Sequence, residues 1–314
     1  MKRVLVTGAS GFIGSHTIQS LLDRGFEVHA TNSGGASETL SCLPPSTCHK
    51  ADLLDPTQTT RIIETVRPTH LLHLAWIVRP GELISSTENL DWVVASIHLM
   101  REFHANGGQR FVGVGSCYEY DWEYGYCSEA LTPTVPNTVY GASKNAFREI
   151  AEAYGREHGL DFGWARIFFL YGPNENQNRL VPSVVLSLLR GAEAKSSHGL
   201  QIRDYMHVQD AADGIVALLD SAETGAFNIA SGAALRIRDI VQTIGQELQA
   251  SELVRIGVLP ARKNDTPLVV ADTRKAEECL QFKPRYDLVS GIRHTIDWWR
   301  TQIAKDETRT GDLK

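Results

Sequence analysis

The sequence predicts an α/β protein with a doubly wound parallel sheet, and three observations carry this prediction. Short β-rich runs alternate with longer helical runs through the first half of the chain. The helical runs are long enough to form the right-handed crossovers that join parallel strands. A glycine-rich turn at residues 8–14 separates the first strand from the first helix. Together these features predict a sheet that is covered by helices on both faces.

Turn and capping residues mark several element boundaries in this half. Gly25 ends the helix expected at 15–24, and Pro68 ends a helix at 56–66 for which Asp55 is the candidate N-cap. The expected strands are 2–7, 27–31, 70–74, 110–114 and 162–169, and the two longest helices are 90–105 and 140–158.

The pattern becomes irregular after Tyr171-Gly-Pro173. A short strand expected at 226–229 returns to the sheet, and further helices are expected at 181–190, 208–220, 237–248 and 288–300. We therefore expect a main domain over 1–170 plus about 207–230, and a smaller C-terminal lobe over about 171–206 plus 231–300. The polar tail at 301–314 is expected to be loose.

Composition limits the classes of function. The chain has 314 residues, of which 42% are hydrophobic and 22% charged, as is typical of soluble globular proteins. A net charge of −6 and the lack of a basic run argue against nucleic-acid binding. We see no apolar run of membrane-spanning length and no signal peptide, so we expect a cytoplasmic protein. Scattered histidines and five cysteines without a Cys-x-x-Cys pair give no support for a metal site or a disulfide framework.

The glycine-rich turn has the pattern Gly8-x-x-Gly11-x-x-Gly14 between a predicted strand and a predicted helix, which is the context that a dinucleotide-binding loop requires. Glycine permits a sharp turn and lets a pyrophosphate approach the N-terminus of the helix. The alternative is a plain strand-to-helix turn. The cofactor contacts expected from this loop are Gly8, Ser10, Gly11, Phe12, Ile13 and Gly14.

The second predicted strand ends at Thr31-Asn32-Ser33 without an acidic residue. An acidic side chain there would bind the adenosine ribose of NAD, so its absence favours NADP. No arginine is present to bind the 2′-phosphate, and NAD is therefore the alternative. We expect Asn32 and Ser33 near the ribose, and Asp52 and Leu53 near the adenine. The alternative for Asp52 is an ordinary loop or helix-start carboxylate.

Tyr140 and Lys144 stand four residues apart in a predicted helix, so their side chains share one face. A nearby ammonium favours the phenolate and is expected to lower the pKa of Tyr140. Tyr140 could then donate or accept a proton in an alcohol–ketone interconversion. The spacing alone is common on helix surfaces, and it is the glycine loop in the same chain that favours a catalytic pair.

With these motifs in place, the chain resembles the extended short-chain dehydrogenase/reductase family, which includes nucleotide-sugar epimerases, dehydratases and reductases. The resemblance runs over residues 2–300. The matching segments are Thr7-Gly-Ala-Ser-Gly-Phe-Ile-Gly-Ser-His16, Ala51-Asp-Leu-Leu-Asp55, His73-Leu-Ala75, Gly115-Ser-Cys-Tyr-Glu-Tyr120, Tyr140-Gly-Ala-Ser-Lys144, Arg166-Ile-Phe-Phe-Leu-Tyr-Gly-Pro173, Arg203-Asp-Tyr-Met-His-Val-Gln-Asp210 and Phe227-Asn-Ile-Ala-Ser-Gly232. The resemblance implies a Rossmann sheet with a smaller substrate-binding lobe.

The resemblance also implies roles for single residues. Ser116, four residues before Tyr120, would hold the reacting sugar oxygen beside Tyr140, and Lys144 would also bind the nicotinamide ribose. Leu74, Ala75 and Asn89 would lie near the cofactor, with a helix cap as the alternative for Asn89. The expected substrate contacts are Cys117, Tyr118, Phe169, Asn178, Arg179, Arg203 and Arg262, and the two arginines Arg203 and Arg262 would bind the diphosphate.

Several departures from the family pattern narrow the reaction. Many sugar dehydratases have Thr-Asp-Glu where this chain has Ser116-Cys-Tyr118, so the carboxylate pair for water elimination is missing and Glu119 is out of register. Phe169 replaces an asparagine that many epimerases use to bind substrate. Cys117 could move a proton beside a ketone, and the alternative is an inert buried thiol. The aromatic segment 118–126 is expected to overhang the sugar, or to be a packed loop.

These inferences predict an NAD(P)-dependent enzyme that acts on a nucleoside-diphosphate sugar. Our first choice is a ketoreductase of a 4-keto-6-deoxyhexose nucleotide, in which Tyr140 protonates the oxygen that Ser116 holds. The alternative is a 4-epimerase that retains NAD, and a dehydratase or a non-catalytic dinucleotide-binding protein is less favoured. The family also implies a homodimer formed through the helices at 90–105 and 140–158, unless their apolar faces only cover the sheet.

Overall fold

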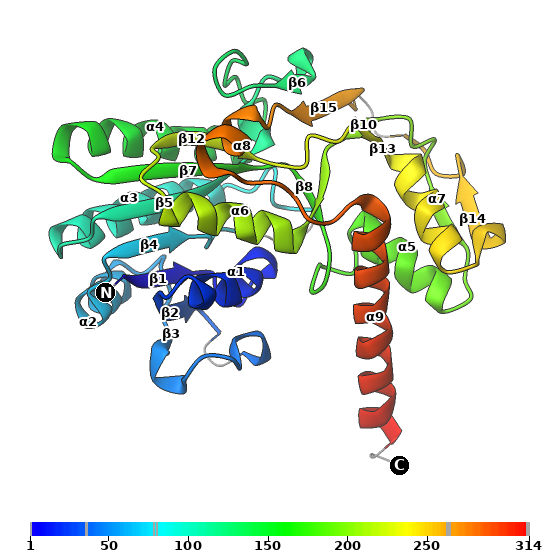
Figure 1. Ribbon diagram of the computed structural model, residues 1–314, viewed down its shortest axis with the longest axis horizontal. Helices are drawn as coiled ribbons and strands as arrows, with labels where there is room; N and C mark the ends of the chain where they lie inside the picture. The colour runs from blue at the N-terminus through cyan, green and yellow to red at the C-terminus, as the bar shows by residue number, and fades with distance from the viewer. Residues whose placement is uncertain (1, 35–36, 78, 80, 262–264, 312–314) are drawn as a thin grey trace.

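A parallel sheet organises the fold, as predicted, and it has seven strands, of which the one at Cys48–Lys50 was not predicted (Figure 1). The computed structural model describes residues 2–34, 37–77, 79, 81–261 and 265–311. The strand order is β12-β7-β5-β4-β1-β2-β3, so the order reverses on either side of β1. These strands are β1 (Arg3–Thr7), β2 (Glu27–Asn32), β3 (Cys48–Lys50), β4 (His70–His73), β5 (Arg110–Ser116), β7 (Asp161–Ile167) and β12 (Gly225–Ile229).

Helices cover both faces of this sheet because each buries one apolar side against it. On one face, α1 (Phe12–Asp23), α6 (Val208–Asp220) and α8 (Arg274–Leu280) share a core with strand residues such as Val4 and Ala165. On the other face, α2 (Pro56–Val66), α3 (Glu88–Ala105) and α4 (Val139–His158) pack on Leu5, Leu71 and Phe111. The predicted return of the chain to the sheet is confirmed, because β12 pairs in parallel with β7.

A third apolar core joins α5 (Leu180–Leu189), α7 (Ile237–Glu247) and α9 (Leu288–Gly311), which lie together at the side of the sheet in Figure 1. The loose tail predicted from residue 301 is wrong, because α9 continues to Gly311. Thr301 Oγ donates a hydrogen bond to the Asp297 carbonyl, and Ile303 packs against this third core. The helix therefore continues about three turns beyond residue 300, where the sequence predicted its end.

Small sheets connect the main sheet to these helices. Their strands are β6 (Tyr126–Cys127), β8 (Phe169–Tyr171), β9 (Ala194–Ser196), β10 (Ile202–Arg203), β11 (Tyr205–His207), β13 (Leu235–Arg236), β14 (Val254–Ile256) and β15 (Leu268–Ala271). The register of β8 and β11 places Tyr205 opposite Phe169. Two 3₁₀ turns, η3 (Cys117–Glu119) and η4 (Trp122–Tyr124), follow β5 directly. Within the described part of the chain, none of the helices has the length and apolar character needed to cross a membrane.

The main sheet brings the predicted site residues to one edge. Strands β1, β2, β4 and β5 run parallel and end at Thr7, Asn32, His73 and Ser116. In sheets of this kind, ligands bind outside the carboxyl ends of the strands, where the strand order reverses. The glycine loop follows β1 at this point, and Ser116 lies two strands away on β5.

Candidate active site

The glycine loop has the geometry of a phosphate cradle. Gly8 has φ of +66°, and a Cβ there would stand 2.8 Å from the Ala75 backbone nitrogen. A Cβ on Gly14 would lie 2.3 Å from the Gly8 carbonyl oxygen. Helix α1 begins at Phe12 with Gly11 as its N-cap, so no side chain caps its first N–H groups. These groups and the bare backbone fit a dinucleotide pyrophosphate.

A buried hydrogen-bond chain supports this cradle from below. Thr7 Oγ1 accepts hydrogen bonds from the backbone N–H groups of Leu74 and Ala75 at 3.1 and 3.2 Å. His73 lies 2.8 Å from Thr7 Oγ1 and 2.8 Å from Ser96 Oγ. Burial lowers the pKa of His73 to about 3, so its imidazole is neutral. Thr7 and Ser96 were not predicted, because their role depends on contacts between distant segments.

The residues predicted to lie beside the adenosine differ in whether their side chains can reach it. Asn32 is the last residue of β2, and Ser33 follows it. Asp52 is exposed, and its carboxylate accepts a hydrogen bond from the Leu54 N–H at 3.0 Å. The Leu53 side chain is buried in the core beside α2, so any contact with the adenine would have to come from its backbone.

Asn89 does not fit the predicted cofactor contact. Its side chain is fully buried, and its Nδ2 donates to the carbonyls of Leu83 and Ser86, both at 2.8 Å. Its Oδ1 accepts from Trp76 Nε1 at 2.8 Å. All of its polar atoms are therefore used inside the protein. Asn89 instead fixes Trp76, whose ring centroid lies 3.7 Å from Lys144 Nζ.

Ser116 and Tyr140 come together at the end of β5, and the Lys144 ammonium lies against the backbone of the same strand. Ser116 hydrogen-bonds to Tyr140, and Lys144 Nζ donates to the Val114 carbonyl at 2.8 Å. The N-terminus of α4 is pressed against the η3 segment, since a Cβ on Gly141 would stand 2.1 Å from the Tyr118 carbonyl oxygen. Glycine at 141 thus lets Tyr140 approach Ser116.

The expected lowering of the Tyr140 pKa is wrong for this structure. Burial raises the pKa of Tyr140 above its ordinary value, and the hydrogen bond with Ser116 opposes this shift. The Lys144 ammonium is directed to the Val114 carbonyl and the Trp76 ring. Burial also lowers the pKa of Lys144 itself to about 7, against the opposing effect of the Glu119 carboxylate.

Aromatic rings form one side of the predicted substrate region. The Tyr118 ring contacts Tyr140 edge-on at 5.8 Å and packs on Trp122 at 4.5 Å between centroids. Trp122 packs on Phe169 at 6.3 Å, and Phe169 stacks on Tyr205 at 5.5 Å. The aromatic segment is thus a packed wall that begins at Tyr140. We refer to Tyr118, Trp122, Phe169 and Tyr205 as the aromatic wall.

Arg203 lies at the far end of the aromatic wall. Its guanidinium carbon is 5.6 Å from the Phe169 ring centroid and 5.8 Å from that of Trp122. Its Nη2 pairs with Asp265 at 2.5 Å. Arg262, the second predicted diphosphate arginine, lies outside the described residues. The predicted pair Asn178 and Arg179 is exposed at the start of α5.

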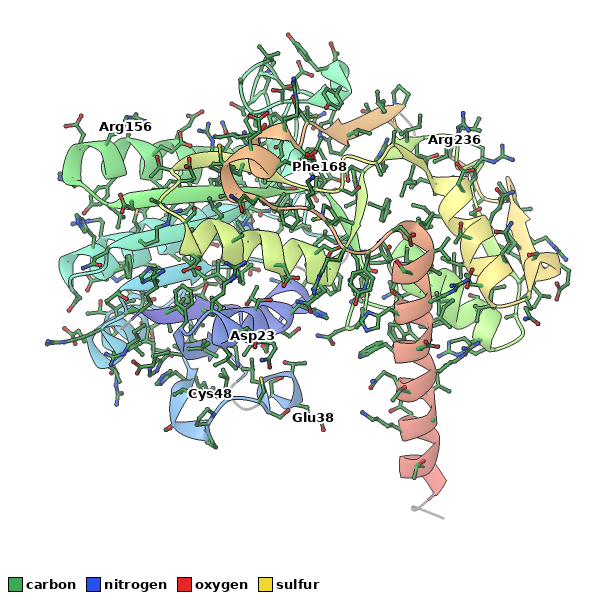
Figure 2. All side chains as sticks on the ribbon, viewed as in Figure 1. Asp23, Glu38, Cys48, Arg156, Phe168 and Arg236 are labelled. Carbon is green, nitrogen blue, oxygen red and sulfur yellow. The ribbon has the colours of Figure 1, made fainter. Side chains whose placement is uncertain are left out.

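Cys117 does not fit the predicted substrate contact. Only 1% of its surface is exposed, and it packs in a cluster with Tyr120, Cys127 and Phe168. Phe168 lies near the centre of the molecule in Figure 2. Burial raises the pKa of the Cys117 thiol far above its ordinary value, so it does not form a thiolate. The structure therefore favours the inert thiol.

Glu175, which follows the Tyr171-Gly-Pro173 segment, was not among the predicted site residues. Its carboxyl is 9% exposed, and its Oε2 has no hydrogen-bond partner. Burial raises its pKa to about 8, and the Arg179 guanidinium opposes this shift. A glutamate in a loop gives no local signal of burial, so only the structure identifies it.

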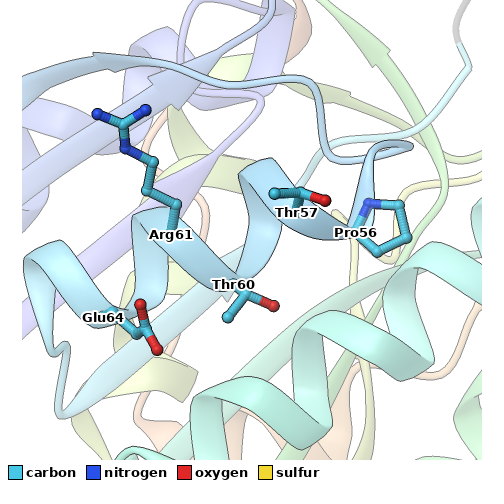
Figure 3. A pocket seen from close by; sticks show the side chains of 5 residues that line it. All are labelled: Pro56, Thr57, Thr60, Arg61 and Glu64. Carbon is cyan, nitrogen blue, oxygen red and sulfur yellow. The ribbon is translucent and has the colours of Figure 1, made fainter.

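The described chain also has a surface hollow away from this site. A hollow of about 410 Å³ lies on α2, lined by Pro56, Thr57, Thr60, Arg61 and Glu64 (Figure 3). None of the predicted site residues lines it. The described residues contain no group of three or more His, Cys, Asp or Glu side chains that could hold a metal ion.

A glycine cradle with serine, tyrosine and lysine at the carboxyl edge of a doubly wound sheet defines a dinucleotide-dependent oxidoreductase of the short-chain dehydrogenase type. The resemblance seen in the sequence is confirmed by comparison with known proteins. Residues 4–230 match the model of the NAD dependent epimerase/dehydratase family, and the chain belongs to this family.

The relatives are nucleotide-sugar enzymes of similar length. The chain is 25% identical to UDP-glucose 4-epimerase of Rhizobium meliloti over 94% of this chain and 96% of the relative. It is 28% identical to dTDP-glucose 4,6-dehydratase of Streptomyces antibioticus, with 96% and 93% covered. The crystal structure of UDP-glucose 4-epimerase from Thermus thermophilus in complex with NAD matches with a TM-score of 0.84 and 26% identity, covering 95% of this chain and 99% of that one.

Proposed function

We propose that this chain is a ketoreductase that reduces a 4-keto-6-deoxyhexose attached to a nucleoside diphosphate. When bound, the nicotinamide supplies the hydride to the carbonyl carbon. Ser116 donates a hydrogen bond to the carbonyl oxygen, and Tyr140 delivers the proton to that oxygen as negative charge develops on it. Lys144 stabilises this charge through its ammonium and binds the ribose beside the nicotinamide.

The observation that carries the proposal is the contact of Tyr140 with Ser116 while the nearby acidic and thiol groups are turned away. Glu119 is fully buried and engaged by Arg166 at 2.8 Å, and Cys117 is 1% exposed. Neither can exchange protons with a sugar in the cleft. Elimination of water needs an acid and a base in addition to the tyrosine. Because Glu119 and Cys117 cannot take these roles, the site supports hydride transfer without dehydration.

The substrate class is supported by the aromatic wall, and Arg203 is proposed to bind the diphosphate by exchanging its present bonds to the Ile202 carbonyl and Asp265. Flat ring faces stack on the apolar face of a sugar, and a guanidinium binds a diphosphate through two parallel hydrogen bonds. In this proposal, residues 1–170 plus about 207–230 bind the dinucleotide, and about 171–206 plus 231–300 bind the nucleotide sugar. Arg262, Asn178 and Arg179 belong to the proposed substrate contacts.

A 4-epimerase is the second candidate, and the relatives named above favour it. The same three residues would then oxidise and re-reduce one sugar carbon on a retained NAD. Gel filtration of the purified protein separates the two reactions. The reductase should elute without cofactor and consume NADPH in a one-to-one ratio with a keto sugar. Elution with bound NAD, and interconversion of sugars without net cofactor consumption, would establish the epimerase instead.

The cofactor is proposed to be NADP, because β2 ends at Asn32-Ser33 without a carboxylate to repel a 2′-phosphate. The Thermus thermophilus relative was solved with NAD, which makes NAD the alternative. A thermal-shift panel with NAD, NADP and several nucleoside diphosphates tests both choices. The ligands that bind most tightly should raise the unfolding midpoint most, by mass action.

We further propose a homodimer formed by α3 and α4. Apolar side chains are exposed on both helices: Leu90 by 56%, Val94 by 70% and Ile150 by 43%. An exposed apolar surface of this kind is typical of an interface. Val94→Asp should halve the mass measured by light scattering, and an unchanged mass would contradict this interface. A cytoplasmic location is also proposed, and the five free cysteine thiols support it.

A further inference from the structure

Glu119 is a buried carboxylate directly behind the catalytic residues. It has no solvent exposure, and it lies at the end of η3, three residues after Ser116. Its oxygens accept hydrogen bonds from the Ser116 N–H at 2.7 Å, Trp164 Nε1 at 3.0 Å and Arg166 Nε at 2.8 Å. Arg148 Nε, 4.0 Å from Oε2, is the fourth partner. A buried charge is costly unless it is paired, and these contacts supply the pairing.

The contacts of Glu119 fix the position of Ser116. Ser116 Oγ accepts from the Tyr118 N–H at 3.3 Å while Glu119 accepts from the Ser116 N–H, so the two residues cap the turn reciprocally. The fit is tight, since a Cβ on Gly115 would stand 2.2 Å from Glu119 Oε1. Loss of this carboxylate would leave the Ser116 N–H without its partner and would loosen the turn that holds the Ser116 hydroxyl beside Tyr140.

Glu119 also acts on the charge of Lys144. Burial favours the neutral amine, and the Glu119 carboxylate opposes it by favouring the ammonium. His73, on the adjacent strand β4, is neutral and contributes no opposing charge. The titratable and charged groups around Glu119 and Lys144 include Tyr140 and Arg148 on α4, Arg166 on β7, His73 on β4, and Cys117 and Tyr120 in and beside η3.

We propose that Glu119 is a positioning residue of the hydride-transfer site, which holds Ser116 in place and favours the ammonium form of Lys144. This proposal rests on the proposed function for its effect on turnover. Its effect on the dinucleotide site does not depend on the identity of the sugar. The ammonium of Lys144 is the form that can support negative charge on the Tyr140 oxygen and donate to a ribose hydroxyl.

The first test is a titration of NADH and NADPH binding, followed by nicotinamide fluorescence between pH 6 and 9, which needs no sugar. In the unmodified protein, binding should weaken as Lys144 loses its proton. In Glu119→Gln the same weakening should occur about one pH unit lower, giving a roughly 5-fold higher Kd at pH 7 and a less than about 2-fold higher Kd at pH 6. An unchanged pH dependence would overturn the proposal.

Glu129→Gln is the matched control. Glu129 is also a carboxylate whose pKa is raised by burial, and it accepts a hydrogen bond from the Asn228 N–H at 2.7 Å. Within the described residues, neither Ser116 nor Lys144 is a hydrogen-bond partner of its side chain. Its pH dependence should equal that of the unmodified protein. A shift in Glu129→Gln as large as that in Glu119→Gln would mean that any loss of buried charge has this effect, and it would refute the specific role of Glu119.

A double variant removes the risk that Glu119→Gln fails to fold because Arg166 is left unpaired. Glu119→Gln/Arg166→Gln replaces the ion pair with two amides that can hydrogen-bond to each other. A downward pH shift is also expected in the double variant, smaller than in Glu119→Gln because the Arg166 charge is removed as well. Its absence from both variants would overturn the proposal. In turnover, kcat should fall at least 10-fold with the sugar KM within 2-fold, whereas a purely structural role would not shift the pH profile.

Discussion

Replacing Lys144 with methionine should stabilise the protein while it removes activity. Burial lowers the pKa of Lys144 from 10.5 to about 7, so in the folded protein the amine is neutral between these values while the unfolded chain carries the charge. The unfolded state therefore binds more protons in this window, and stability rises with pH from about 7 to 10.5. Below pH 7 the folded protein bears the full cost of a buried charge, on the order of 5 kcal/mol at most.

The expected size of the effect follows from this window. Each pH unit above 7 adds about 1.4 kcal/mol to the free energy of unfolding, so the unmodified protein gains roughly 2.7 kcal/mol between pH 7 and pH 9 through Lys144. Lys144→Met lacks this gain. With an unfolding entropy of about 2.1 cal/mol/K per residue, the difference corresponds to roughly 4 °C in Tm for a chain of this length.

Differential scanning calorimetry of the cofactor-free protein at pH 6, 7, 8 and 9 measures this difference. Lys144→Met should have the higher Tm at pH 6, and its advantage should shrink by about 4 °C at pH 9. Lys195→Met serves as a control, since the Lys195 side chain is 56% exposed and carries little burial cost. Parallel curves for Lys144→Met and the unmodified protein would refute the buried, low-pKa amine.

Three further predictions test other parts of the site. Tyr140→Phe should lower kcat at least about 100-fold with little change in cofactor affinity, measured by steady-state kinetics and NADH titration, because it removes the proton donor but not the ring; retained turnover would contradict the proposed role. Gly141→Ala should lower Tm and kcat together, since its Cβ would stand 2.1 Å from the Tyr118 carbonyl, whereas the exposed neighbour Ala142→Ser should change neither. Glu175→Gln should flatten the pH dependence of stability: burial raises the pKa of Glu175 from 4.5 to about 8, so the folded protein retains a proton that the unfolded chain releases, and stability falls as pH rises through this window. Urea unfolding at pH 5 and pH 8 should show this fall in the unmodified protein, and an equal fall in Glu175→Gln would rule out the assignment.

The sequence by itself determined the features that are local along the chain. The alternation of strands and helices predicted the parallel sheet, and the glycine spacing predicted the cradle, because glycine at these positions is required by the backbone path. The spacing of Tyr140 and Lys144 predicted a shared helix face for the same reason. The strand predicted at 110–114 is also close to β5. The observed strand continues to Ser116 and so places the hydroxyl that is proposed to be catalytic at the sheet edge.

Only the tertiary structure decided which of the candidate side chains face the cleft. Cys117 and Glu119 closely follow the predicted catalytic serine in the sequence, and both turn inward. Arg166 and Trp164, from a distant strand, bind the Glu119 carboxylate, and Cys117 packs in an apolar cluster. Asn89 is likewise engaged by backbone carbonyls and Trp76. The charge state of Lys144 also depends on segments far along the chain, because burial and a facing carboxylate act through space and leave no pattern in the local sequence.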